Sequence, residues 1–291
     1  MQPLAAAWVF LAIRVVLLGL ERPLGKKVVV GYSPFAAGFA FYGAAMIALI
    51  PTLIVYSRYH PLTSLHFLPY AIVSASLFIT PFYFYIAALN HGEVSVITPL
   101  YSLGTLLVFF LPILFQGEAF TWLKLAGVLL LLAGSLFLMP GINPIASLRN
   151  LLQDKGARFM LVNTALIAVI RLIDNRAADF DPIYYGISCA VLCGVFFGVG
   201  VLVTKTWHEL FGLYKARKAF VWANGIVNGH AYVSLLAALG AGLDMSVAEP
   251  VSNMSMLIAV VMGHYMFREK IRARLLASIL MIVGVFLLVR G

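Results

Sequence analysis

The sequence predicts an all-α polytopic membrane protein with about ten transmembrane helices, arranged as two inverted five-helix repeats. Of the 291 residues, 63% are hydrophobic and only 11% are charged, a balance that a water-soluble domain of this length does not show. A membrane-spanning helix needs about 20 mainly apolar residues. Segments of this kind recur along the whole chain and are separated by short polar joints.

Five spans are expected in each half of the chain. They cover residues 4–20, 34–56, 65–89, 94–115 and 122–139 in the first half, and 158–173, 182–204, 219–239, 247–267 and 274–289 in the second. The longest polar joint lies near the middle. The sequence therefore predicts a first repeat over residues 1–140, a linker over 141–157 and a second repeat over 158–291.

The two halves share an order of small motifs. Ala88-Leu89, Gly92, Pro99 and Glu118 in the first half correspond to Ala238-Leu239, Gly242, Pro250 and Glu269 in the second, and Pro34 and Pro182 open the second span of each half. Because each half has an odd number of spans, the second half must enter the bilayer in the opposite orientation. Such inverted repeats place a central site where it can open to either side of the membrane.

Several short segments carry a family resemblance. They are Ala87-Ala88-Leu89, Ser95-Val96-Ile97-Thr98-Pro99-Leu100, Gln116-Gly117-Glu118, the stretch from Gly127 to Gly134, and Glu249-Pro250, Ser255 and Gly284 in the second half. With these segments the chain resembles the EamA-like branch of the drug/metabolite transporter superfamily, although Arg268-Glu269 replaces the Gly-Glu pair in the second copy. The resemblance implies ten helices, no cofactor, and export or exchange of small metabolites.

We therefore predict a secondary transporter, an exporter or exchanger of small metabolites such as amino acids or drug-like compounds, in the cell (inner) membrane. Its expected partners are a small-molecule substrate and the lipid bilayer, and the chain is expected to act as a monomer or homodimer. The formal charge of +9 could suggest a nucleic-acid partner, but Lys and Arg lie in the joints and form no basic stripe. We therefore predict no nucleic-acid partner.

Two alternatives stay open, a lipid-linked sugar flippase and a membrane-embedded lipid-modifying enzyme. An enzyme of that kind needs a concentrated reactive set, such as an Asp-rich metal motif or a His/Asp/Ser group. The sequence contains no such motif and no metal-ligand spacing. We therefore predict no enzymatic activity and no metal site.

Polar side chains at bilayer depth are costly and normally face a cavity or a partner. Asn224, Asn228 and Tyr232 recur every four residues and so share one helical stripe. The predicted substrate-binding residues are Arg14, Tyr85, Tyr101, Asn224, Asn228, Tyr232 and Asn253. The alternatives are a structural ion pair for Arg14 and hydrogen bonds between helices for the amides.

Glu249 is the predicted coupling residue, because a desolvated carboxylate can bind a proton in the physiological range. A position near the headgroups, where it would stabilise the start of its helix, is the alternative. Arg171 and Asp174 are expected to form a local ion pair at the membrane interface, and Glu118 and Thr121 to stabilise helix starts. The positive-inside rule places both termini outside the cell, whereas the family resemblance favours the cytoplasm, so the orientation stays open.

Overall fold

The computed structural model describes residues 2–91, 101–137, 155–267 and 274–291. All regular elements in these ranges are helical. In the first half they are α1 (Gln2–Val29), α2 (Pro34–Ala48), α3 (Ile50–Tyr59), α4 (Leu68–His91), the 3₁₀ turn η1 (Ser102–Gly104), α6 (Thr105–Gln116) and α7 (Trp122–Phe137). In the second they are α9 (Lys155–Ala177), α10 (Pro182–Thr204), α11 (Trp207–Gly240), α12 (Met245–Ser252), α13 (Ser255–Phe267) and α14 (Arg274–Arg290).

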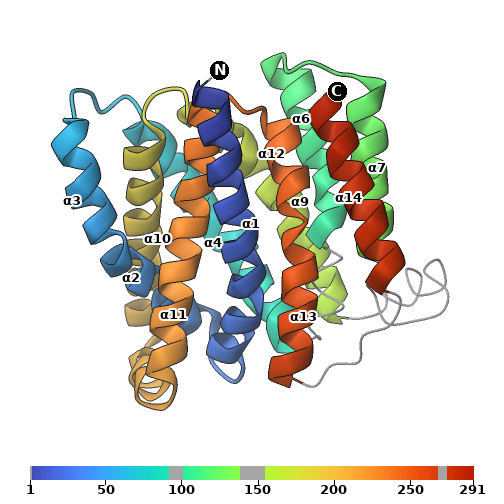
Figure 1. The fold of residues 1–291 in the computed structure, drawn as a ribbon. Helices are drawn as coiled ribbons and strands as arrows, with labels where there is room; N and C mark the ends of the chain where they lie inside the picture. The colour runs from blue at the N-terminus through green and yellow to red at the C-terminus, as the bar shows by residue number, and fades with distance from the viewer. Residues whose placement is uncertain (1, 92–100, 138–154, 268–273) are drawn as a thin grey trace.

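The predicted all-α polytopic class is confirmed. Within the described ranges, six helices or helix pairs are long and apolar enough to cross a membrane, and three shorter apolar helices accompany them. The helices stand roughly side by side, and both chain termini lie at the same end of the bundle (Figure 1). We call this the terminal end.

Several boundaries differ from the prediction, and α1 in particular continues to Val29, nine residues past the expected end of the first span. The second span is split at Leu49 into α2 and α3, where Pro51 cannot continue the backbone ladder. The ninth span is split after Asn253 into α12 and α13. Helix α11 begins at Trp207, twelve residues before the expected start at Ala219, and has non-helical backbone angles at Arg217. Most of the predicted linker lies outside the described residues, but its last three residues already belong to α9.

Matched signals start the second helix of each half. The side chain of Ser33 caps α2 by accepting a hydrogen bond from the Ala36 N–H, and the carboxylate of Asp181 caps α10 by accepting from the N–H groups of Ile183 and Tyr184. Each cap is followed directly by a proline, which needs no hydrogen-bond acceptor in the first turn.

The helix packing is reciprocal between the two halves. Helix α1 packs on α11 as α9 packs on α4, and α1 packs on α13 as α9 packs on α6. Three pairs join equivalent helices directly: α2 with α10, α6 with α12, and α7 with α14. In addition, α1 runs away from the terminal end, whereas α9 runs toward it (Figure 1). These pairings are what two inverted halves related by a pseudo-twofold axis would produce, and they support the predicted repeat.

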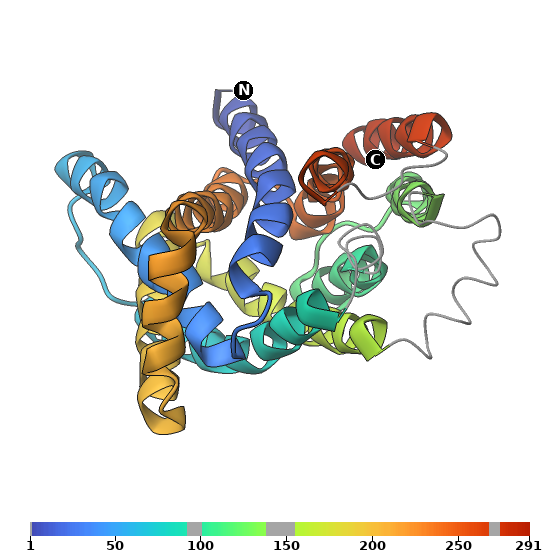
Figure 2. The ribbon, with the colours of Figure 1, turned by 90° about the horizontal axis from the view of Figure 1, so that it is seen from below.

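Helices α7 and α14 lie side by side at one edge of the bundle (Figure 2). A side chain at Gly127 would place its Cβ 2.6 Å from the carbonyl oxygen of Gly284, and one at Gly134 would place it 2.9 Å from the carbonyl of Ala277. Gly127 with Gly134 and Ala277 with Gly284 have the same seven-residue spacing, so a twofold axis would exchange the two contacts. Small residues of this kind let membrane helices approach closely.

Replacing Gly127 by leucine is therefore expected to separate α7 from α14. Such overpacking costs about 1–3 kcal/mol, and the melting temperature of the purified protein in detergent should fall. Gly212→Leu is the matched control, because nothing lies within 4 Å of a Cβ built there. Equal melting temperatures for the two variants would contradict the close α7–α14 contact.

Candidate functional site

A cavity lies in the middle of the bundle, with about 850 Å³ of empty space, including space open to the outside. Its wall is built by α1, α2 and α4 of the first half, by α9, α10 and α11 of the second, and by Tyr101. Five of the predicted substrate-binding residues line it: Arg14, Tyr85, Tyr101, Asn228 and Tyr232. Both halves of the chain thus contribute polar groups to one cavity.

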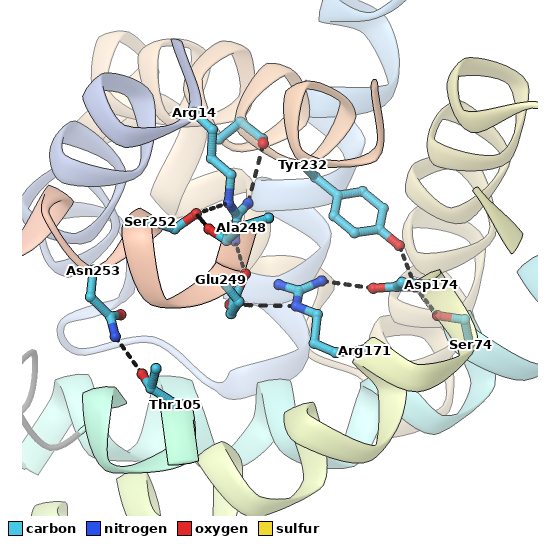
Figure 3. Close-up of polar contacts among 11 residues, drawn as sticks. Arg14, Ser74, Thr105, Arg171, Asp174, Tyr232, Ala248, Glu249, Ser252 and Asn253 are labelled. Carbon is cyan, nitrogen blue, oxygen red and sulfur yellow. Dashed lines mark hydrogen bonds and ion pairs between the residues drawn. The ribbon is translucent and has the colours of Figure 1, made fainter. Parts of the chain in front are cut away.

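Four buried charged side chains form a row of ion pairs (Figure 3), and the two arginines of this row line the cavity. The Arg14 Nη2 lies 2.7 Å from the Glu249 Oε2, and the Arg171 Nε lies 3.5 Å from the Glu249 Oε1. At its other end, Arg171 binds Asp174 through Nη1 and Oδ2 at 2.7 Å. The four residues are between 0% and 7% exposed. Two positive and two negative charges alternate, so these four side chains have no net charge. Membrane proteins usually keep ionised groups at bilayer depth by pairing them in this way.

Asp174 anchors this row of ion pairs to three further helices. Its Oδ1 accepts hydrogen bonds from Ser74 on α4 at 3.1 Å, from Tyr185 on α10 at 2.7 Å and from Tyr232 on α11 at 2.8 Å. The fully buried carboxylate is thereby satisfied at both oxygens. The network connects α1, α4, α9, α10, α11 and α12 through side chains.

Arg14 makes two additional hydrogen bonds. Its Nε donates to the Ser252 Oγ at 2.8 Å, and its Nη1 donates to the Ala231 carbonyl at 3.2 Å. These acceptors lie on α12 and α11, so a single guanidinium from α1 holds two helices of the other half. The structure therefore gives Arg14 the ion pair considered above, at the cavity wall.

The expected ion pair between Arg171 and Asp174 is present. Helix α9 continues to Ala177, four residues beyond the predicted end of the sixth span, and both residues of the pair are buried against other helices. Arg171 also lines the cavity. The i, i+3 spacing of opposite charges inside an apolar segment was the available signal. Glu249 is likewise buried, and it lies between two guanidiniums.

Two of the predicted substrate-binding residues do not line the cavity. Asn224 is fully buried and its amide has no hydrogen-bond partner, and its oxygen lies near Gly25 of α1. Asn253 donates a hydrogen bond to Thr105 and so joins the α12–α13 break to α6 (Figure 3). The four-residue stripe on α11 therefore faces the cavity only at Asn228 and Tyr232. Asn253 matches the alternative of a bond between helices.

A second polar group lies on the cavity wall farther from the terminal end. The Tyr85 hydroxyl donates to the Glu21 Oε1 at 3.1 Å, and the Arg22 guanidinium lies 4.9 Å from the centre of the Tyr101 ring. Glu21 lies on the cavity wall with Arg14, because a spacing of seven residues returns to the same face of α1. Arg22 was not among the predicted site residues.

Thr121 stabilises the helix start expected of it, whereas Glu118 stabilises a different one. The Glu118 carboxylate accepts from the N–H groups of Met245 and Ser246, both at 2.9 Å. The helix that it caps is α12 of the second half, and not the helix that follows it in sequence. Thr121 accepts from the Lys124 N–H at the start of α7 at 3.1 Å.

A profile of the EamA-like transporter family matches residues 5–139. The first half of this chain is therefore similar to the EamA-like transporter family, which is part of the drug/metabolite transporter superfamily. This confirms the predicted family resemblance over these residues. The chain is a multi-pass membrane protein, and its first half matches transporters of the drug/metabolite type.

A solved crystal structure supports the fold over the whole chain. It superposes with a TM-score of 0.70 at 15% sequence identity, and the match covers 98% of each chain. At this identity the similarity concerns the fold alone. Among curated proteins, no matching sequence was found.

Proposed function

We propose that the chain is a secondary transporter that carries a small organic solute through the central cavity by alternating access. The observation that carries this proposal is a cavity with polar side chains on a wall that both halves share, together with reciprocal packing between those halves. Rocking of two inverted repeats about such a cavity can expose it first to one side and then to the other. The solute is a small metabolite such as an amino acid or a drug-like compound, and the chain exports or exchanges it across the cell membrane as a monomer or homodimer.

The row of buried ion pairs acts as the gate on the terminal side of the cavity. Arg14 lies nearer to the start of α1 than Glu21 does, and Ser74 lies nearer to the start of α4 than Tyr85 does. Helix α1 begins at the terminal end (Figure 1). The ion-paired side chains of Arg14, Glu249, Arg171 and Asp174 therefore close that side of the cavity. Opening requires these ion pairs to separate.

Glu249 couples the gate to a driving ion. It is the carboxylate shared by Arg14 and Arg171, so a proton that binds to it removes the negative charge between two guanidiniums. The two arginines then repel each other and favour separation of α1 from α9. This proposal retains the predicted coupling role and gives it a geometric basis.

Binding of a solute in the cavity is expected to raise the melting temperature of the detergent-purified protein, since a ligand of the native state stabilises it by mass action. Amino acids, nucleotides, sugars and amphipathic drugs form the first panel. The shift should be dose-dependent and should be lost in Asn228→Ala, because Asn228 lines the cavity. Asn90→Ala, at an exposed amide at the end of α4, is the control and should retain it.

The three possible outcomes of this experiment have different meanings. A shift that Asn228→Ala abolishes supports a soluble-metabolite transporter and names its substrate class. A shift that only lipid-linked sugars produce would favour the flippase alternative. A shift that is equal in all variants would contradict binding in this cavity.

A further inference from the structure

Arg22 is a buried cation whose terminal nitrogens have no acceptor among the residues that the structure describes. Its side chain belongs to α1 and lines the cavity, and the residue is only 3% exposed. Within the described ranges, neither Nη1 nor Nη2 has a hydrogen-bond partner. Buried donors are almost always hydrogen-bonded, so an exception of this kind needs an explanation.

The other two guanidiniums of the cavity wall are engaged differently. Arg14 and Arg171 bind the carboxylates of Glu249 and Asp174. Arg22 instead packs 4.9 Å from the centre of the Tyr101 ring. A ring face attracts a cation, but it offers no lone pair in the plane of the guanidinium. The N–H groups of Arg22 are therefore available to a molecule in the cavity.

We propose that the cavity binds a small organic monoanion with an apolar body, and that Arg22 binds its carboxylate. This inference rests on the proposed transport function and specifies its substrate class. A carboxylate can accept two parallel hydrogen bonds from one guanidinium. In a buried cavity such a charge-assisted pair satisfies both orphan nitrogens at once.

The surroundings of Arg22 define the rest of the ligand. Leu18, Phe78 and Phe82 line the same cavity and can cover an apolar or aromatic body. The neighbouring Glu21 carboxylate, which accepts from Tyr85 at 3.1 Å, places a negative charge on the same wall. A second negative charge on the ligand would be repelled by Glu21, so a monocarboxylate fits better than a phosphate dianion.

The test measures dissociation constants with the detergent-purified full chain. The probes are 3-phenylpropionate, its neutral amide 3-phenylpropionamide, and phenyl phosphate at pH 8. The wild-type protein should bind the carboxylate at least tenfold more tightly than the amide or the phosphate. Arg22→Met should weaken carboxylate binding at least tenfold and leave amide binding unchanged. Arg22→Lys, which retains the charge but not the forked donors, should fall between the two.

Three results would overturn the proposal. They are equal affinities of the wild type for carboxylate and amide, unchanged carboxylate affinity in Arg22→Met, and no binding of any anionic probe. The first and third use only the wild-type protein, so the test does not depend on folding of the variants. None of these results would contradict the proposed transport function, which depends on access to the cavity from both sides of the membrane. That access is tested separately, by chemical labelling of the cavity wall.

Discussion

Replacing Asp174 with alanine is expected to destabilise the protein by about 3–5 kcal/mol, the usual consequence of removing one partner of a buried ion pair. The change would leave Arg171 without its partner at 2.7 Å and would remove the common acceptor of Ser74, Tyr185 and Tyr232. Because these groups come from four helices, the helices around the cavity should lose their fixed arrangement. Thermal unfolding in detergent and solute uptake into proteoliposomes measure the two effects.

Asp179 provides the matched control. It forms an ion pair with Arg176 at the same i, i+3 spacing, but the pair is 3.5 Å long and both side chains are 66% exposed. Exposed pairs contribute about 0–1 kcal/mol, so Asp179→Ala should retain its melting temperature and transport. A loss in Asp179→Ala as large as that in Asp174→Ala would show that the buried network has no special role.

Glu249→Met is expected to cost a similar amount, about 3–5 kcal/mol, because it leaves Arg14 without its ion-pair partner. Arg14→Met should also destabilise the protein, since it leaves Glu249 with only the 3.5 Å contact to Arg171. The double variant should cost less than the sum of the two single changes, as for any pair in direct contact. Thermal unfolding of the four proteins completes this cycle.

Transport separates the role of Glu249 in the gate from its role in stability. If Glu249 carries the coupling proton, the double variant should be folded but should show no pH-dependent uptake into proteoliposomes. Additive costs in the cycle would contradict a direct Arg14–Glu249 pair. Normal pH-dependent uptake by the double variant would contradict the coupling role.

Much of the fold follows from apolar length and repeated signals. The caps at Ser33 and Asp181, for example, stand before matched prolines. The helix breaks at Leu49 and Asn253, in contrast, cannot be predicted from hydropathy alone. In particular, span counting cannot place a helix end to within one turn. The predicted sixth span therefore ended one residue before Asp174, which the structure places inside α9.

The site was predictable only in part. Arg14, Asn228 and Tyr232 are polar groups inside apolar spans, and such groups are expected at a cavity or a partner. Which of these two applies depends on helix rotation, and so Asn224 and Asn253 lie outside the cavity although they share the same pattern. Arg22 lies just beyond the predicted end of the first span, so nothing in its sequence context distinguishes it from a topology signal.

The most direct test of alternating access uses the two cysteines of the chain, Cys189 and Cys193. Both are free and both line the cavity. A membrane-impermeant maleimide would be applied to vesicles of each orientation, with a Cys189→Ala/Cys193→Ala variant as the unlabelled control. Alternating access predicts that the cysteines are modified from both sides of the membrane. Modification from one side alone, or from neither while a permeant maleimide reacts, would contradict it.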